Sequence, residues 1–149
     1  MLVEKIEAIC KQVKPDYIFE YEESAMLNVK ADSYARGDKF VYVEEFTKGR
    51  YIVDGYKKKK VTQVQIWFCR LSLERNEDDE IVRNELHNNA ITREQIRNQI
   101  ESEITLPFMT EFEKQIHEID TWQFYTPLPR FDANEVSIML QFEYKNDIC

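Results

Sequence analysis

The segment from Val61 to Leu73 constrains the fold most, because its second half is apolar on both sides. Alternate residues of a strand point to opposite faces of the sheet. Three apolar residues of this segment point one way and four point the other: Val64, Ile66 and Phe68 against Trp67, Cys69, Leu71 and Leu73. A strand that is apolar on both faces is typical of the centre of a sheet, and we expect this one to lie there.

Two periodicities predict the other elements. Apolar residues at helical spacing predict a helix over residues 2–13, which Pro15 ends. A helical pattern also runs from Asn76 to Ile104, as one helix or as two broken near residues 88–89, and Pro107 interrupts it. Capping boxes at residues 92–95 and 110–113 predict helix starts there, the second opening a short helix. Strands are expected at residues 17–21, 25–29, 39–46, 122–125 and 136–144.

These elements predict an α+β fold in which a mainly antiparallel mixed sheet is packed by an N-terminal helix and a long central helical region. We find no repeat and no internal linker, so residues 1–149 are expected to form a single domain. Gly49 and the Asp54-Gly55 pair mark turns between two strands. We therefore expect a protruding loop or hairpin from Thr47 to Lys60.

The charge is unevenly distributed along the chain. Residues 1–75 carry 14 basic and 12 acidic side chains, a balance of +2, whereas residues 76–149 carry 6 and 16, a balance of −10. This distribution disfavours general phosphate binding, which needs a surplus of lysine and arginine on the contact face. It favours head-to-tail association, in which one surface meets a different surface of the next copy.

No pattern for a catalytic, cofactor or metal site emerges from the residues. The three glycines cannot form a phosphate-cradling loop, and the three separated cysteines indicate reduced thiols. The best enzyme alternative is a metal-dependent nuclease that combines Asp16 with Glu143 and Lys145. We expect no enzyme activity and no cofactor. No apolar run is long enough to cross a bilayer, so we also expect a soluble, unprocessed chain without a membrane partner.

The one local basic patch lies within the predicted hairpin. Lysines beside strands commonly stay solvated and prevent edge pairing, but here they also suit contact with the acidic half of a neighbouring copy. The residues that we expect at a subunit interface are Arg50, Tyr51, Lys57, Lys58, Lys59 and Lys60.

The order and spacing of the elements resemble those of the phage tail-terminator family, small α/β proteins that cap a finished tail tube. The resemblance covers most of the chain and is a matter of pattern. It is carried by residues 40–43 before the loop, 64–68 after it, 103–109 at the helix break and 136–144 at the end of the sheet. A neighbouring head–tail joining or tail-completion protein fits the same pattern.

The resemblance implies a non-enzymatic structural protein of a phage or prophage virion. It implies a homo-oligomeric ring, usually of six copies, that stops tube growth and joins tail to head, with the long loop at ring contacts. Its partners would be the tail tube protein and a head-completion protein. DNA would pass through without specific binding, helped by an acidic channel. The protein would lie in the host cytoplasm before assembly and in the virion afterwards. Besides the nuclease, a cytosolic adaptor domain that binds one protein partner remains an alternative.

Overall fold

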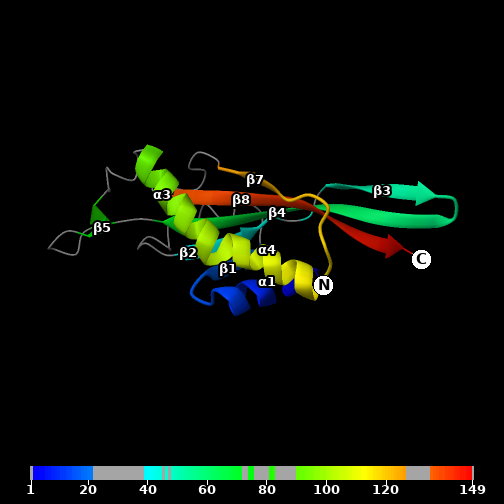
Figure 1. Cartoon of the computed structure of the whole chain (residues 1–149), viewed down its shortest axis with the longest axis horizontal. Coiled ribbons are helices and arrows are strands. Elements are labelled where there is room, and N and C mark those ends of the chain that lie inside the picture. Colours follow the sequence, from blue (N-terminus) through cyan, green and yellow to red (C-terminus); the bar gives the residue numbers. More distant parts are fainter. Residues whose placement is uncertain are drawn as a thin grey trace.

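A long antiparallel pair of strands, β4 (Lys57–Leu71) and β8 (Glu135–Ile148), runs the length of the molecule (Figure 1). The computed structural model describes residues 2–21, 39–44, 46, 48–71, 74–75, 81–82, 90–126 and 135–148. They form a single α+β domain with a mixed sheet, as predicted. The described helical elements are α1 (Leu2–Val13), α3 (Ala90–Ile100), the π-helical turn η2 (Glu101–Thr105) and α4 (Leu106–Gln115).

The main sheet has the strand order β1-β2-β4-β8-β7, and β3 adds a further pairing to β4. The pair β1 (Ile18–Tyr21) and β2 (Lys39–Val43) is parallel, and all other pairs are antiparallel. Strands β3 (Gly49–Asp54) and β7 (Gln123–Tyr125) lie on opposite sides of the β4–β8 pair. Short strands β5 (Glu74–Arg75) and β6 (Ile81–Val82) form a separate pair. The expectation that β4 is central is confirmed.

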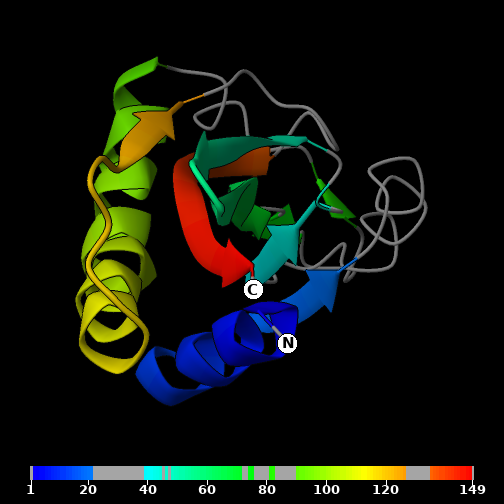
Figure 2. The same ribbon diagram turned by 90° about the vertical axis from the view of Figure 1, so that its right-hand side faces the viewer.

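The helices cover one face of the sheet. Figure 2 shows α1 along one side of the sheet and the α3–α4 helix along the next. Between them and the strands lies the main core, which takes alternate residues of β2, β4 and β8. Its strand residues include Val41, Val43, Val64, Ile66, Phe68, Ile138, Leu140 and Phe142, and its helix residues include Ile6, Ile9, Cys10, Ile100, Ile104, Phe108 and Phe112. The expected apolar faces of the first helix and of the last strand are therefore confirmed.

The opposite face of the sheet is also apolar near its centre. Phe40, Tyr42, Trp67 and Cys69 are buried there, and Met139 packs against them partly buried. Trp67 and Cys69 thus face away from Val64, Ile66 and Phe68, as the alternation along β4 predicts. The two-sided character of this strand follows directly from its sequence.

The helix after β6 does not end where the sequence predicts. Proline has no N–H to donate, and its ring crowds the carbonyl four residues back, so Pro107 was expected to interrupt the helix. Instead α3, η2 and α4 follow one another without a gap from Ala90 to Gln115. The N–H of Leu106 bonds to the carbonyl of Glu101, five residues back, and this wider turn lets the helix pass the proline.

The two helix starts predicted from the capping boxes are both wrong. Thr92 lies inside α3, which begins at Ala90, and Thr110 lies inside α4, where its hydroxyl donates to the carbonyl of Leu106 at 3.1 Å. The helical prediction is also wrong at Ile81–Val82, which pairs with Glu74–Arg75 as a strand. The expected strand at 25–29 and the break near 88–89 lie outside the described residues. So do residues 32–38 and 127–134, whose sequences predict a polar loop and a turn.

The expected hairpin is present at one end of the molecule. β3 pairs with the first residues of β4, from Gly49 opposite Thr62 to Asp54 opposite Lys57. The end of β8 flanks the other side of β4 along the same stretch. Figure 1 shows these three strands extending beyond the helices. We call residues 48–60 the arm.

Candidate subunit interface

Two glycines allow the arm to form. Gly55 follows Asp54 at the tip with a φ of 60°, a backbone conformation that primed hairpin turns require and that glycine adopts without strain. Gly49 begins β3 so close to β4 that a Cβ atom there would lie 2.3 Å from the carbonyl oxygen of Val61. Gly55 therefore permits the tight turn at the tip, and Gly49 permits the close contact between β3 and β4.

The register gives the arm two different faces. Directly opposite residues of paired strands share a face. Tyr51 lies opposite Lys60 and Val53 opposite Lys58, so these four side chains share one face, which we call the open face. The residues that alternate with them on β3 and β4 lie on the other face, which we call the paired face: Arg50, Ile52, Asp54, Lys57, Lys59 and Val61.

The paired face neutralises much of its own charge. Arg50 Nη2 lies 2.8 Å from Glu143 Oε2, and Lys59 Nζ lies 4.0 Å from Asp147 Oδ1, both acids being on β8. All four side chains are largely exposed, so these ion pairs contribute little to folding stability. They do reduce the charge that Arg50 and Lys59 present to a partner.

The open face is apolar and positively charged. The exposed fraction is 67% for Tyr51 and 63% for Val53. Neither Lys58 nor Lys60 forms an ion pair with any residue that the structure describes. Tyr56, at the tip, is fully exposed. An aromatic and an aliphatic side chain beside two uncompensated cations form a surface that suits an acidic, partly apolar protein partner.

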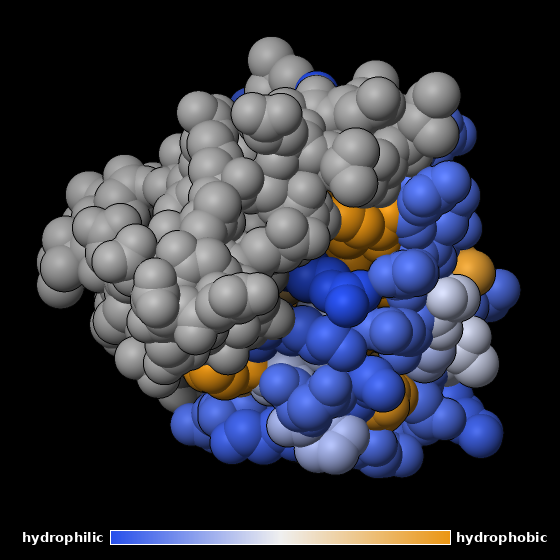
Figure 3. Space-filling view, turned by 90° about the vertical axis from the view of Figure 1, so that its left-hand side faces the viewer, coloured by the Kyte–Doolittle hydropathy of each residue, from blue (hydrophilic) through white to orange (hydrophobic). Residues whose placement is uncertain are grey.

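The arm contrasts in charge with the rest of the chain. Its six basic side chains and one acidic side chain give +5, which leaves −13 for the remaining residues. Viewed from the end opposite the arm, the described surface is mainly hydrophilic, with small and separate apolar patches (Figure 3). The arm is therefore the described region that combines exposed apolar side chains with surplus positive charge.

The structure brings the six expected interface residues together on one arm but divides them between two faces. Tyr51, Lys58 and Lys60 lie on the open face. Arg50, Lys57 and Lys59 lie on the paired face, and two of them already pair within the chain. Val53 is not among the expected residues, although its spacing of two from Tyr51 in a strand is the signal that places both on one face.

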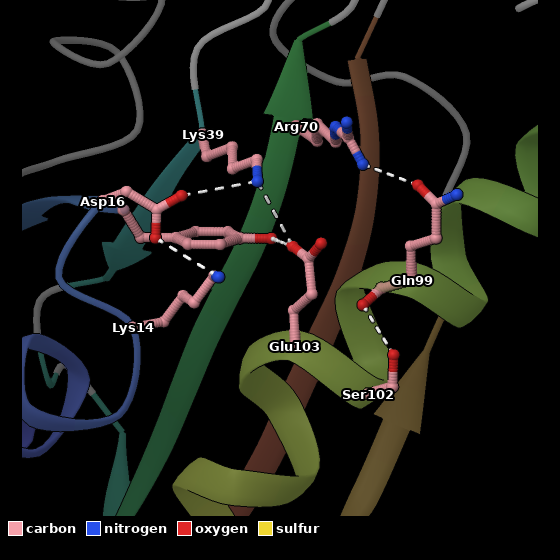
Figure 4. Close-up of polar contacts among 8 residues, drawn as sticks. Lys14, Asp16, Lys39, Arg70, Gln99, Ser102 and Glu103 are labelled. Atoms are coloured by element: carbon pink, nitrogen blue, oxygen red, sulfur yellow. Dashed lines mark hydrogen bonds and ion pairs between the residues drawn. The ribbon is translucent and has the colours of Figure 1, made fainter.

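A second group of polar side chains joins three parts of the chain: the link between α1 and β1, the start of β2, and the π-helical turn (Figure 4). The hydroxyl of Tyr17 donates to Glu103 Oε2 at 3.2 Å. The ammonium group of Lys39 lies 3.4 Å from Glu103 Oε2 and 3.4 Å from Asp16 Oδ2. Lys14 also approaches Asp16, at 3.8 Å. Each charge of this group, which we call the clasp, is therefore met by an opposite charge.

The environment of Tyr17 holds its hydroxyl in the neutral form. Only 3% of Tyr17 is exposed. Burial first, and then the negative charge of Glu103, raise the pKa of the Tyr17 hydroxyl well above its ordinary value. The hydroxyl therefore acts as a hydrogen-bond donor to Glu103. The clasp fastens three elements together, and Glu103 is placed for it by the turn that also lets the helix pass Pro107.

The residues of the nuclease alternative lie far apart. Asp16 contacts Lys39, whose backbone pairs with Arg70 near the end of β4. Glu143 pairs with Gln63, seven residues earlier on β4, which at about 3.4 Å per residue is a separation of roughly 24 Å along the strand. In the described ranges no three His, Cys, Asp or Glu side chains are grouped to hold a metal ion. Asp16 and Glu143 do not form one site.

From the sequence alone, His117 follows Ile116 in the predicted short helix and is expected to be solvated. The structure contradicts this. His117 follows the end of α4 and is half-buried, with its ring stacked on Tyr144 at a centroid distance of 4.9 Å and edge-on to Phe112. His87, Cys149 and the acidic run at residues 77–80 lie outside the described residues. Cys10 and Cys69 are buried and carry free thiols.

None of the helices in the described part of the chain is both long and apolar enough to cross a membrane. No protein-family model matches the sequence, and no curated protein matches it.

Proposed function

We propose that the protein is a non-enzymatic structural subunit that assembles with copies of itself into a closed ring through the arm. The observation that carries the proposal is the charge and surface of the arm: +5 on residues 48–60 against −13 on the rest of the chain, with Tyr51 and Val53 exposed beside lysines that form no ion pair with the described residues. An arm of one sign and a body of the other are unlike surfaces, so contacts between copies are head-to-tail. Such contacts form a ring when the rotation between copies closes.

Within this class we propose a virion role like that of the phage tail terminators that the sequence pattern resembles. The ring caps the tail tube and joins it to the head, with the tube protein and a head-completion protein as partners. The acidic balance of the chain outside the arm supports passage of DNA without adhesion, because like charges repel the phosphates. The subunit lies in the host cytoplasm before assembly and in the virion afterwards.

The test compares two triple charge reversals by sedimentation velocity at low ionic strength. The first changes Lys57, Lys58 and Lys60 to Glu, three hairpin lysines that lack a partner within the described chain. The control changes Lys5, Lys11 and Lys114 to Glu, which are exposed lysines outside the arm, so the change in net charge is the same.

We expect the wild-type protein and the control to sediment as the same oligomer and the arm variant to sediment as a smaller species. Added salt should also dissociate the wild-type oligomer, because exposed charges are screened. Equal sedimentation of the two variants would contradict the role of the arm. A wild-type protein that stays monomeric at its highest soluble concentration would contradict self-assembly itself.

A further inference from the structure

The outer edge of β3 is open. β3 pairs with β4 on one side, and no strand in the described part of the chain pairs with its other side. A free edge of six residues presents a row of unpaired N–H and C=O groups, which is a template for another strand. Natural proteins usually protect such edges with lysine or proline on the edge strand itself. β3 contains neither, since Lys48 precedes it and Lys57 to Lys60 lie on β4.

One hydrogen bond fixes which groups of β3 point outward. The N–H of Gln63 donates to the carbonyl of Lys48 at 2.9 Å, so these opposite residues form a hydrogen-bonded pair. In an antiparallel pair, hydrogen-bonded and non-hydrogen-bonded pairs alternate. Arg50, Ile52 and Asp54 therefore bond to β4, whereas Gly49, Tyr51 and Val53 direct their N–H and C=O groups away from it.

The outward backbone groups and the exposed apolar side chains belong to the same residues. Tyr51 and Val53 each contribute an outward N–H and C=O group and a side chain on the open face. An added strand would therefore form main-chain hydrogen bonds and cover apolar surface at the same positions. This is the arrangement by which extended segments join an exposed sheet edge.

We propose that β3 of one copy pairs edge-to-edge with a strand from a second copy, through the outward backbone groups of Gly49, Tyr51 and Val53. The choice of a second copy rests on the proposed function and on charge: the chain outside the arm carries −13, whereas Lys58 and Lys60, beside this edge, form no ion pair within the described ranges. Main-chain pairing defines the register between copies, and the charges orient their approach.

Amide hydrogen exchange of the wild-type protein tests the proposal at single residues. In dilute, dissociated protein the amides of Tyr51 and Val53 should exchange fast, whereas those of Arg50 and Ile52 should be protected by β4. At concentrations where the protein is assembled, the amides of Tyr51 and Val53 should become protected as well. If they still exchange fast in the assembled protein, the edge is not paired and the proposal fails.

A pair of variants at Val53 separates backbone from side chain. Val53→Ala removes most of the side chain but keeps the N–H, and Val53→Pro removes the outward N–H as well, a change that edge strands tolerate. We expect the proline variant to associate about tenfold more weakly than the alanine variant, with unchanged circular dichroism of the dissociated chain. Equal association of the two variants would overturn the proposal.

The other outcomes separate this proposal from the function on which it rests. If the lysine reversals dissociate the oligomer but Val53→Pro and Val53→Ala behave alike, the arm acts through charge and edge pairing is refuted. If duplex DNA, and not self-association, protects the amides of Tyr51 and Val53, the occupant is not a second copy and the proposal is also refuted. A monomeric wild-type protein would refute both.

Discussion

Changing Tyr17 to Phe tests the clasp with a single oxygen atom. The substitution keeps the buried ring and removes the hydroxyl that donates to Glu103 at 3.2 Å. A hydrogen bond to a charged group contributes about 1.5–3 kcal/mol to stability. Glu103 keeps Lys39 at 3.4 Å and is itself partly exposed, so the carboxylate is not left without a partner. We therefore expect a loss near the lower end, about 1–2 kcal/mol at neutral pH.

This loss is large enough to measure by thermal unfolding. For a chain of this length, 1 kcal/mol lowers the midpoint by about 2–4 °C, so Tyr17→Phe should lower it by roughly 2–8 °C. Glu103→Gln is the matched partner variant, because an amide oxygen still accepts a bond from Tyr17 but no longer carries the charge that Lys39 meets. An unchanged midpoint in Tyr17→Phe would show that the hydroxyl does not bond to Glu103.

The dependence on pH gives an independent signature of the same bond. The pKa of Tyr17 is raised in the folded protein, by burial first and then by Glu103. As the pH rises past the ordinary tyrosine value of 10.0, the unfolded chain loses this proton while the folded chain keeps it. The unfolded state then binds fewer protons, so stability falls with pH. The contribution of Tyr17 is fully present below this value and is lost above it.

The difference in midpoint between the wild-type protein and Tyr17→Phe should therefore be constant from about pH 7 to about pH 9 and shrink as the pH rises towards about 11. The other tyrosines are common to both proteins, so their ionisation does not produce this difference. A difference that stays constant over the whole range would refute the account of Tyr17. A difference that grows with pH would mean that folding lowers the pKa of Tyr17 instead of raising it.

Three further substitutions test the packing of the core, the close contact between β3 and β4, and one ion pair of the arm. Phe112→Ala empties a fully buried position whose ring lies 5.0 Å from that of Phe142, and it should cost about 3–5 kcal/mol in urea unfolding; a cost below about 1 kcal/mol would contradict this packing. Gly49→Ala places a methyl group against the carbonyl of a neighbouring strand, so amides of β3 should lose exchange protection while those of β2 keep it; unchanged protection of β3 would show that the strands are farther apart. Glu143→Gln removes the charged partner of Arg50. Because both side chains are about half exposed, the free energy of unfolding should change by less than about 1 kcal/mol. A larger loss would show that the pair is shielded from solvent, contrary to the structure.

The sequence specified elements whose pattern is long and regular. Ile6, Ile9 and Cys10 share one side of the first helix, and Val64, Ile66 and Phe68 share one side of β4, because burial on one face imposes the period of the element. The same reasoning gave the α+β class and the central place of β4. Such patterns extend over many residues, so a single exception does not remove them.

Local signals were less reliable in the long helix. Pro107 and the Thr110 capping box each indicate a helix boundary from a few residues, but Phe108 and Phe112 are fully buried on the same side of α4. Packing of these rings against the sheet favours a continuous helix, and the π-helical turn removes the conflict with the proline. Tertiary contacts of this kind are not visible in a local motif.

The sequence located the basic hairpin along the chain but did not show which of its side chains share a face. The Asp54-Gly55 pair and the lysine run located a basic hairpin. The register of β3 and β8 on β4 then decided that Arg50 and Lys59 meet acids of β8 while Lys58 and Lys60 do not. Register depends on pairing between distant segments, so the division of the arm into two faces required the structure.

Native mass measurement of the wild-type protein at low ionic strength tests the central claim most directly. An arm of one charge that contacts a body of the other should give one closed oligomer of fixed stoichiometry, which dissociates as salt is added. A monomer at every concentration, or an open series of masses without a preferred size, would contradict the account.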